Sequence, residues 1–250
     1  MIPLFDSPRR RTFPYVNVAI IAVNFIVFFY ELSLTTDLVT RHVSQLDIFI
    51  LHWGNIPACT LDSLGRDAVA SRSAVCSSQP HPASTILTAM FIHGGWLHIA
   101  GNMLFLFIFG DNVEDAMGHI RYAIFYLLIG AVAAFTHMSV YPDDLQPAIG
   151  ASGAIAGVMG AYIVLFPRAT VTASIPLLFF IPFPIPAFVM IGFWFIVQLF
   201  SGFSAIGVDA VGAAGGVAYF AHIGGFIAGA ALVNVFLLGR PRPAPVRPLR

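Results

Sequence analysis

The 250-residue chain is short of charge, and it contains no lysine at all. Only 10% of its residues are charged, whereas a soluble domain of this length carries roughly 25%. Because 58% are hydrophobic and the mean hydropathy is +0.85, we expect lipid to cover much of the surface. The formal net charge is zero, so nothing in the composition points to a nucleic-acid partner.

Cysteine is scarce too. Cys59 and Cys76 are the only two, and both lie in the one long polar stretch, residues 34–85. If this stretch faces an oxidising compartment, the pair can form a disulfide. Two free thiols would fit the sequence equally well.

Long apolar runs, in contrast, are abundant. A helix needs roughly 20 residues to cross a hydrocarbon core of about 30 Å, and six segments are candidates. Pro176, Pro182, Pro184 and Pro186 interrupt the fifth, so regular helix is expected there only from about Ile185. The six segments are residues 16–32, 96–109, 122–140, 152–166, the later part of 175–200, and 216–238.

We therefore expect an all-α polytopic membrane protein. Its six-helix domain covers residues 15–238, after a short segment, 1–14, and before a basic, proline-rich tail, 239–250, that lies near anionic lipid. Six crossings place both termini on one side, and the positive-inside rule favours the cytoplasm, with residues 34–85 as an extracellular loop. On the inside are Arg9, Arg10, Arg11, Arg121, Arg168, Arg240, Arg242, Arg247 and Arg250, and on the outside Arg41, Arg66 and Arg72.

The first apolar segment could instead belong to a cleaved signal peptide, since it has a basic start and an apolar middle. It ends in Tyr30-Glu31-Leu32, however, with no small-x-small cleavage site nearby. This favours a retained helix.

Two polar residues stand out among the apolar runs. Ser152 lies in a GASG run and His222 in an AHIGG run. Ionisable groups inside a membrane are costly and mark functional sites by default. A hydroxyl and an imidazole that meet form a nucleophile and its general base, which suggests an enzyme that breaks amide bonds.

Glycines would let these two residues meet. Gly153 and Gly157 on the fourth segment, and Gly225 and Gly229 on the sixth, form small-xxx-small patterns that allow close approach of helices in lipid. Gly150, two residues before Ser152, is expected to be a packing glycine as well. His222 shares a helical face with Gly225 and Gly229. Glycines also pack membrane helices without any catalysis, so the pattern indicates a site only in combination with the serine and histidine.

The fourth segment is short. Its fifteen residues, 152–166, make a helix of about 22 Å, roughly 8 Å less than the hydrocarbon core. If its far end reaches the cytoplasmic surface at Arg168, then Ser152 lies below the outer surface, in a pocket that is open to the outside and to water. Free N–H groups at the helix N-terminus can hold an anionic oxygen there.

His98 and Asn102 supply two further donors. They stand four residues apart on one helical face, where both can stabilise an oxyanion. Asn102 could alternatively make an ordinary interhelical hydrogen bond. A metal or haem site of His93, His98, His137 and His222 is disfavoured, because no carboxylate or cysteine joins them and no segment holds an HxxxH pair. We expect neither metal nor cofactor.

Four stretches together resemble the rhomboid family of intramembrane serine proteases. They are MFIHGGWLHIAGN at 90–102, FGDNVEDAMGHIRY at 109–122, GASG at 150–153, in which Gly150 precedes the serine, and AHIGGFIAG at 221–229. Their order and spacing match the family over nearly the whole six-helix core. The resemblance implies Ser152 as nucleophile, His222 as general base and then acid, and His98, Asn102 and the Ser152 backbone N–H as the oxyanion hole.

The resemblance also implies single-span transmembrane substrates that enter sideways near the second and fifth segments. It places the protein in a bacterial-type plasma membrane with its active site open to the outside. The aromatic residues of the fifth segment fit a loosely packed gate, although lipid-facing residues would look the same; they are Phe188, Phe193, Trp194 and Phe195. The chain departs from the family at Ala156, where many members place an aromatic against the histidine.

A polar bracket near the cytoplasmic surface is expected from Glu114, Gly118 and Arg121, which share one helical face.

Two functions other than proteolysis fit the sequence less well. An inactive rhomboid-like membrane chaperone usually lacks the serine or the histidine, and both are here. A small-solute transporter would show inverted repeats with paired broken helices, whereas only one shortened segment is found.

Overall fold

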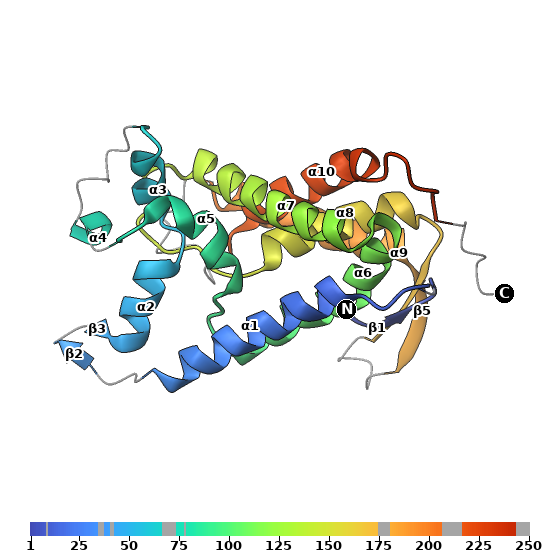
Figure 1. The fold of residues 1–250 in the computed structure, drawn as a ribbon, viewed down its shortest axis with the longest axis horizontal. Coiled ribbons are helices and arrows are strands. Elements are labelled where there is room, and N and C mark those ends of the chain that lie inside the picture. The colour runs from blue at the N-terminus through green and yellow to red at the C-terminus, as the bar shows by residue number, and fades with distance from the viewer. Residues whose placement is uncertain are drawn as a thin grey trace.

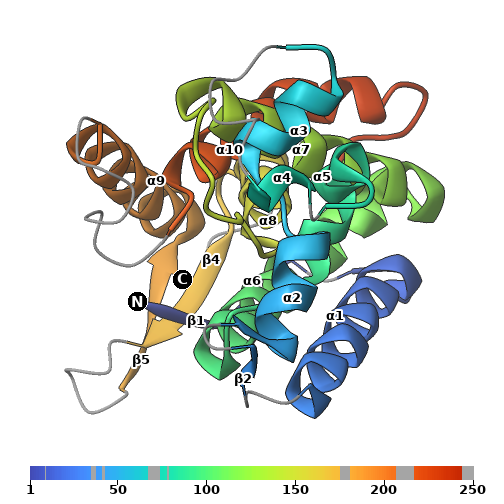
Figure 2. The same cartoon turned by 90° about the vertical axis from the view of Figure 1, so that its left-hand side faces the viewer.

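The structure, a computed structural model, describes residues 1–8, 10–34, 38–40, 43–66, 74–77, 79–174, 181–206 and 217–243. Arg9, Arg41, Arg72, Pro176, Arg247 and Arg250 lie outside the described residues, as does most of the predicted tail. Helices pack side by side into one bundle (Figures 1 and 2). The long ones are α1 (Tyr15–Ser33), α6 (Trp96–Met117), α7 (His119–Val140), α8 (Ser152–Leu165), α9 (Ala187–Ser204) and α10 (Tyr219–Phe236).

Each long helix coincides with one predicted segment. α6 runs further than predicted, because the helix continues past its apolar part through a polar turn and ends at Gly118, whose φ is +81°. α9 begins directly after Pro186, close to the expected start. α8 is short, is buried along most of its length, and lies inside the ring of other helices (Figure 2).

The structure is that of a mostly helical, polytopic membrane protein, as predicted. Among the described residues, α1, α7, α9 and α10 are long and apolar enough to cross a membrane. A fifth crossing results if α6 is joined to the short helices of residues Pro82–Phe91, across an 80° bend. The count of six crossings stays a prediction, because α8 has 14 residues.

A small antiparallel sheet was not predicted. β1 (Ile2–Asp6), β4 (Thr170–Ser174) and β5 (Pro182–Pro186) pair in the order β1-β4-β5 at one end of the bundle (Figure 1). Three of the prolines that were expected only to delay the fifth helix stand at alternate positions of β5, the edge strand. Every second residue of such a strand points its nitrogen away from the neighbour, so proline is tolerated there.

The predicted outer loop lies at the opposite end of the bundle (Figure 1). A disulfide joins Cys59 to Cys76, so the first of the two cysteine states applies. Asn55 donates hydrogen bonds to the hydroxyls of Thr60 and Thr85, which ties the loop together. Its short elements are β2 (Leu38–Thr40), β3 (Val43–Ser44), α2 (Gln45–Trp53), α3 (Pro57–Ser63), α4 (Ala74–Ser77), η2 (Pro82–Ser84), α5 (Thr85–Thr88) and η3 (Ala89–Phe91).

The expected polar bracket holds the other end of the bundle together. The Glu114 carboxylate accepts hydrogen bonds of 3.0 and 2.7 Å from two backbone N–H groups at the start of α1, where a negative charge is favourable. Arg121 donates bonds of 3.0 and 2.7 Å to carbonyl oxygens at the end of α10. α1 therefore begins, and α10 ends, at the same end of the bundle.

Candidate active site

Ser152 and His222 meet at the centre of the bundle. Ser152 is the first residue of α8, and His222 lies in the first turn of α10. The Oγ atom of Ser152 is 2.7 Å from Nε2 of His222. The histidine is only 8% exposed, so the hydrogen bond forms largely out of contact with the surroundings.

The second ring nitrogen of His222 has its own partner. Nδ1 lies 2.8 Å from Oε1 of Gln198 in α9. The Gln198 amide is oriented by a 3.3 Å bond from its Nε2 to the carbonyl of Trp194. Because Oε1 can only accept, Nδ1 must carry the ring proton, and Nε2 is left to accept the proton of Ser152.

α9 thus holds the histidine in place of the missing aromatic at Ala156. The Trp194 ring lies 5.7 Å from the His222 ring, centroid to centroid, and the two planes are tilted by 37°. Trp194 and Gln198 are one helical turn apart and face the same imidazole. Gln198 was not predicted as a site residue; an amide in an apolar segment was the available signal.

The glycines of α8 and α10 permit this contact. A Cβ built on Gly229 would overlap the backbone of Gly157, and one on Gly225 would overlap the carbonyl of Gly153. A Cβ on Gly157 would lie 2.9 Å from the carbonyl oxygen of Gly225. Four of the five predicted packing glycines therefore lie where the two helix backbones touch, and the fifth, Gly150, lies against the His98 ring instead.

His98 lies beside the residues that precede Ser152. A Cβ built on Gly150 would be 2.7 Å from Nε2 of His98, and Gly150 has a φ of +116°, which also favours glycine. Nδ1 of His98 accepts the backbone N–H of Gly94 at 3.3 Å. In the neutral ring Nε2 is therefore the protonated atom, a donor beside Gly150, two residues before Ser152.

Asn102 is less directly placed. Its Nδ2 donates a 3.0 Å bond to the carbonyl of His98, one turn earlier in α6. The residue is buried, at 8% exposure. The second hydrogen of this amide is left for another acceptor.

A small hollow of about 50 Å³ adjoins Ser152. Its lining is mostly glycine and alanine, together with Met90 and His137. A single water molecule needs roughly 10–15 Å³ of such space, so the hollow has room for a few water molecules.

The side of α9 that faces α6 is also hollowed. A cavity of about 130 Å³ there is lined by Phe105, Met190 and Trp194, among others. Of the predicted gate aromatics, Phe188 and Phe193 are more than half exposed, whereas Phe195 stacks on Phe226 at 4.2 Å.

Comparison with known proteins extends these observations. The family model described as the Rhomboid domain matches residues 80–239. The chain is 31% identical over 154 residues to RHOMBOID-like protein 6, mitochondrial, of Arabidopsis thaliana, which is 61% of this chain and 43% of that protein. It is 34% identical over 149 residues to Rhomboid protease GluP of Bacillus subtilis, which is 59% of this chain and 25% of that protein.

A further relative is named as inactive. The chain is 30% identical over 86 residues to Inactive rhomboid protein 1 of Drosophila melanogaster, which is 34% of this chain and 6% of that protein. The chain covers less than half the length of each of these three relatives. Their names thus include both a protease and an inactive protein.

Proposed function

This chain belongs to the rhomboid family, and on that premise we propose that it is an intramembrane serine endopeptidase with a Ser-His dyad. The proposal rests chiefly on one observation, the 2.7 Å contact between Ser152 and His222 inside the bundle of an integral membrane protein. Neither a packing role nor a solute pathway requires a serine hydroxyl directed at the unprotonated nitrogen of an imidazole.

The proposed reaction uses these two side chains in turn. As Ser152 Oγ attacks the substrate carbonyl carbon, its proton passes to Nε2 of His222. The oxyanion accepts hydrogen bonds from Nε2–H of His98, from the free amide hydrogen of Asn102 and from the Ser152 backbone N–H. When the C–N bond breaks, the imidazolium protonates the leaving amine, and water then hydrolyses the acyl-enzyme by the same route.

Gln198 is the proposed positioning residue of this dyad. Its Oε1 accepts the Nδ1–H of His222, which selects the tautomer that can act as a base and stabilises the imidazolium when it forms. An aspartate has this role in soluble Ser-His-Asp enzymes. A neutral amide fills it here without a buried carboxylate, which the membrane interior would disfavour.

Single-span transmembrane proteins are the proposed substrates. A peptide bond must be unwound from its helix to reach Ser152, so helix-breaking residues near the outer end of the substrate should assist. The cavity between α6 and α9 supports sideways entry at that place.

The bacterial plasma membrane, with both termini in the cytoplasm, is the proposed location. Arg10, Arg121 and Arg240 contact the polar end of the bundle, and Arg66 lies in the outer loop. This distribution agrees with the positive-inside rule. Named relatives are mitochondrial and chloroplastic as well as bacterial, so reporter fusions at each terminus are the direct test.

The dyad is tested with Ser152→Ala and His222→Ala. Each variant should lower cleavage of a single-span model substrate in vesicles by at least about a thousandfold. Ser152→Ala should keep a thermal unfolding midpoint near that of the parent, because it removes only one hydroxyl group. Parental cleavage rates in either variant would contradict the assignment.

An inactive, rhomboid-like binding protein is the second candidate, since one relative bears that name. A fluorophosphonate probe separates the two functions. If the dyad is active, the probe should label Ser152 in the parent and fail to label the His222→Ala variant. An inactive protein should show no label in the parent or in the variant.

A further inference from the structure

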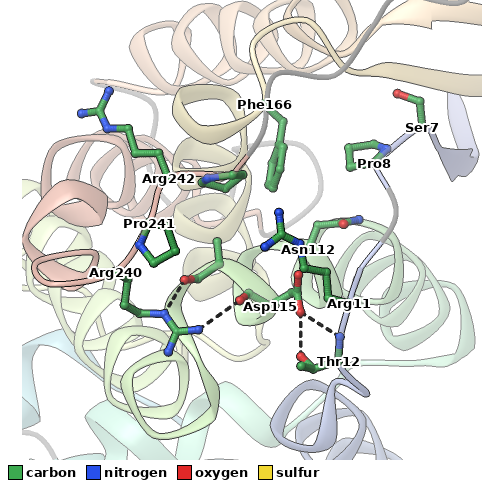
Figure 3. Close-up of a pocket in the computed structure, with 12 residues that line it drawn as sticks. Ser7, Pro8, Arg11, Thr12, Asn112, Asp115, Phe166, Arg240, Pro241 and Arg242 are labelled. Atoms are coloured by element: carbon green, nitrogen blue, oxygen red, sulfur yellow. Dashed lines mark hydrogen bonds between the residues drawn. The ribbon is translucent and has the colours of Figure 1, made fainter.

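A separate pocket opens at the end of the bundle where α1 begins and α10 ends (Figure 3). Its volume is about 340 Å³. Three segments far apart in the sequence form it: residues 7–8 with 11–12, the end of α6 at residues 112–116, and residues 240–243. Phe166, just beyond the last residue of α8, completes the wall, so the pocket lies about 21 Å along that helix from Ser152.

Arginine dominates the charge of this pocket. Arg11, Arg240 and Arg242 line it, against one carboxylate, that of Asp115. The Asp115 side chain is already engaged, because Thr12 donates to it from its backbone N–H at 2.9 Å and from its hydroxyl at 2.7 Å. The net charge of the lining is therefore positive.

Arg240 removes an obstacle to anion binding. The carbonyl end of α6 faces the pocket, and such an end repels negative charge. Nε of Arg240 donates to the carbonyl of Ala116 at 2.8 Å, and Nη2 donates to the backbone carbonyl of Asp115 at 3.4 Å (Figure 3). The Arg240 guanidinium thus neutralises the partial negative charge at this end of α6.

Arg11 is differently placed. Its side chain extends from the N-terminal segment toward the middle of the pocket (Figure 3). Among the residues that the structure describes, its guanidinium makes no hydrogen bond or ion pair. Nearby, the Ser7 hydroxyl oxygen accepts the backbone N–H of Thr170 at 2.9 Å, which leaves the Ser7 proton free to donate.

The lining also has an apolar part. Pro8, Phe166, Pro241 and Pro243 form the walls around the charged centre. A neighbouring pocket of about 320 Å³ shares Phe166 and Arg242 with the first and adds Arg168. The two hollows together join cationic and apolar surface at an end of the bundle where membrane-crossing helices finish.

We propose that this pocket binds the phosphate of an anionic phospholipid, with Arg11 as its free cationic ligand and the proline and phenylalanine walls against the glycerol and first acyl carbons. A guanidinium fork can bind a phosphate through two parallel charge-assisted hydrogen bonds. Inorganic phosphate could make the same hydrogen bonds but has no apolar part to contact the walls, which favours a lipid as the ligand. Basic clusters at the cytoplasmic surface also attract anionic lipid. The lipid would hold the N-terminal segment, α6 and the C-terminal segment together.

Native mass spectrometry of the purified full chain in detergent tests this proposal, with phosphatidylglycerol, phosphatidylcholine and sodium phosphate as probes. The parent should bind phosphatidylglycerol at least about tenfold more tightly than phosphatidylcholine, and Arg11→Gln should lose about tenfold of that affinity, the effect of one charge-assisted hydrogen bond. Arg11→Gln breaks no described hydrogen bond, so its folding should be intact. Arg66→Gln, in the outer loop, is the matched control and should bind like the parent.

Three results would overturn the proposal. One is equal affinity for the two lipids. Another is phosphatidylglycerol binding by Arg11→Gln that equals the binding of the parent. The third is displacement of the lipid by equimolar sodium phosphate, which would mean that the pocket recognises the free anion. Because none of these readouts depends on proteolysis, the proposed function and this proposal can fail separately.

Discussion

His222 makes two side-chain hydrogen bonds, and each constrains the other. Gln198 accepts at Nδ1, so Nε2 has a lone pair for Ser152. Without that acceptor the ring could turn or change tautomer, and the serine would lose its base. Gln198 is therefore a third side chain that acts together with the predicted dyad.

Replacement of Gln198 by leucine should lower kcat about tenfold to a hundredfold, a part of the 10²- to 10⁴-fold effect of a positioned general base. KM should change little, and labelling of Ser152 by a fluorophosphonate should slow in parallel. Asn24→Leu is a matched control, because Asn24 is a buried amide that also bonds one turn back in its helix but does not touch His222. Equal kcat values for both variants and the parent would remove Gln198 from the mechanism.

At the scale of helices, the contact between α8 and α10 positions the two residues of the proposed dyad. Its glycines bring one backbone against the other, so the distance between Ser152 and His222 depends on the absence of β-carbons at Gly157, Gly225 and Gly229. Membrane helices gain little from hydrophobic burial in lipid, and close packing has to supply the attraction instead.

Gly229→Ala should therefore destabilise the protein by about 1–3 kcal/mol through overpacking, because the new methyl group meets the backbone of Gly157, which cannot move aside easily. Cleavage should fall with it. Gly192→Ala is the matched control: no atom lies within 4 Å of its built Cβ, and alanine favours helix by about 1 kcal/mol. Thermal unfolding midpoints that fall equally in the two variants would contradict this account.

At the scale of the whole molecule, the sheet links the N-terminal segment to the bundle. Asp6, the last residue of β1, accepts a 2.6 Å hydrogen bond from the Tyr162 hydroxyl of α8 and a 3.0 Å bond from Asn112 of α6. Burial, with a smaller contribution from the charge of Asp111, raises the pKa of Asp6 to about 7.

Stability should therefore depend on pH through Asp6. The folded protein holds the Asp6 proton more tightly than the unfolded chain does, so this contribution is complete below about pH 4 and is lost as pH rises through about 7. Asp6→Asn cannot titrate, and its unfolding midpoint relative to the parent should rise between pH 5 and pH 8. Asp62→Asn, an exposed position in the outer loop, is the control variant, and a flat difference for Asp6→Asn would refute the assignment.

Much of this architecture could be predicted because it follows from local composition. The six apolar segments, the short fourth helix and the glycine pattern are each contained in a stretch of about 20 residues. The sheet could not be found in this way, since β1 and β4 are more than 160 residues apart and the prolines of β5 suggest only irregular chain. The sequence left open whether the two cysteines form a disulfide or stay as free thiols, because local composition does not show how close they lie in the fold.

The sequence by itself determined the membrane class of the protein, the rhomboid resemblance and the pair Ser152 and His222, because hydropathy and motif spacing are properties of consecutive residues. Only the tertiary structure decided what holds the imidazole, which pockets form and that Arg11, Arg240 and Arg242 share one of them. Those contacts join helices and terminal segments that are far apart in the sequence, so no local sequence pattern indicates which side chains will meet in the folded protein.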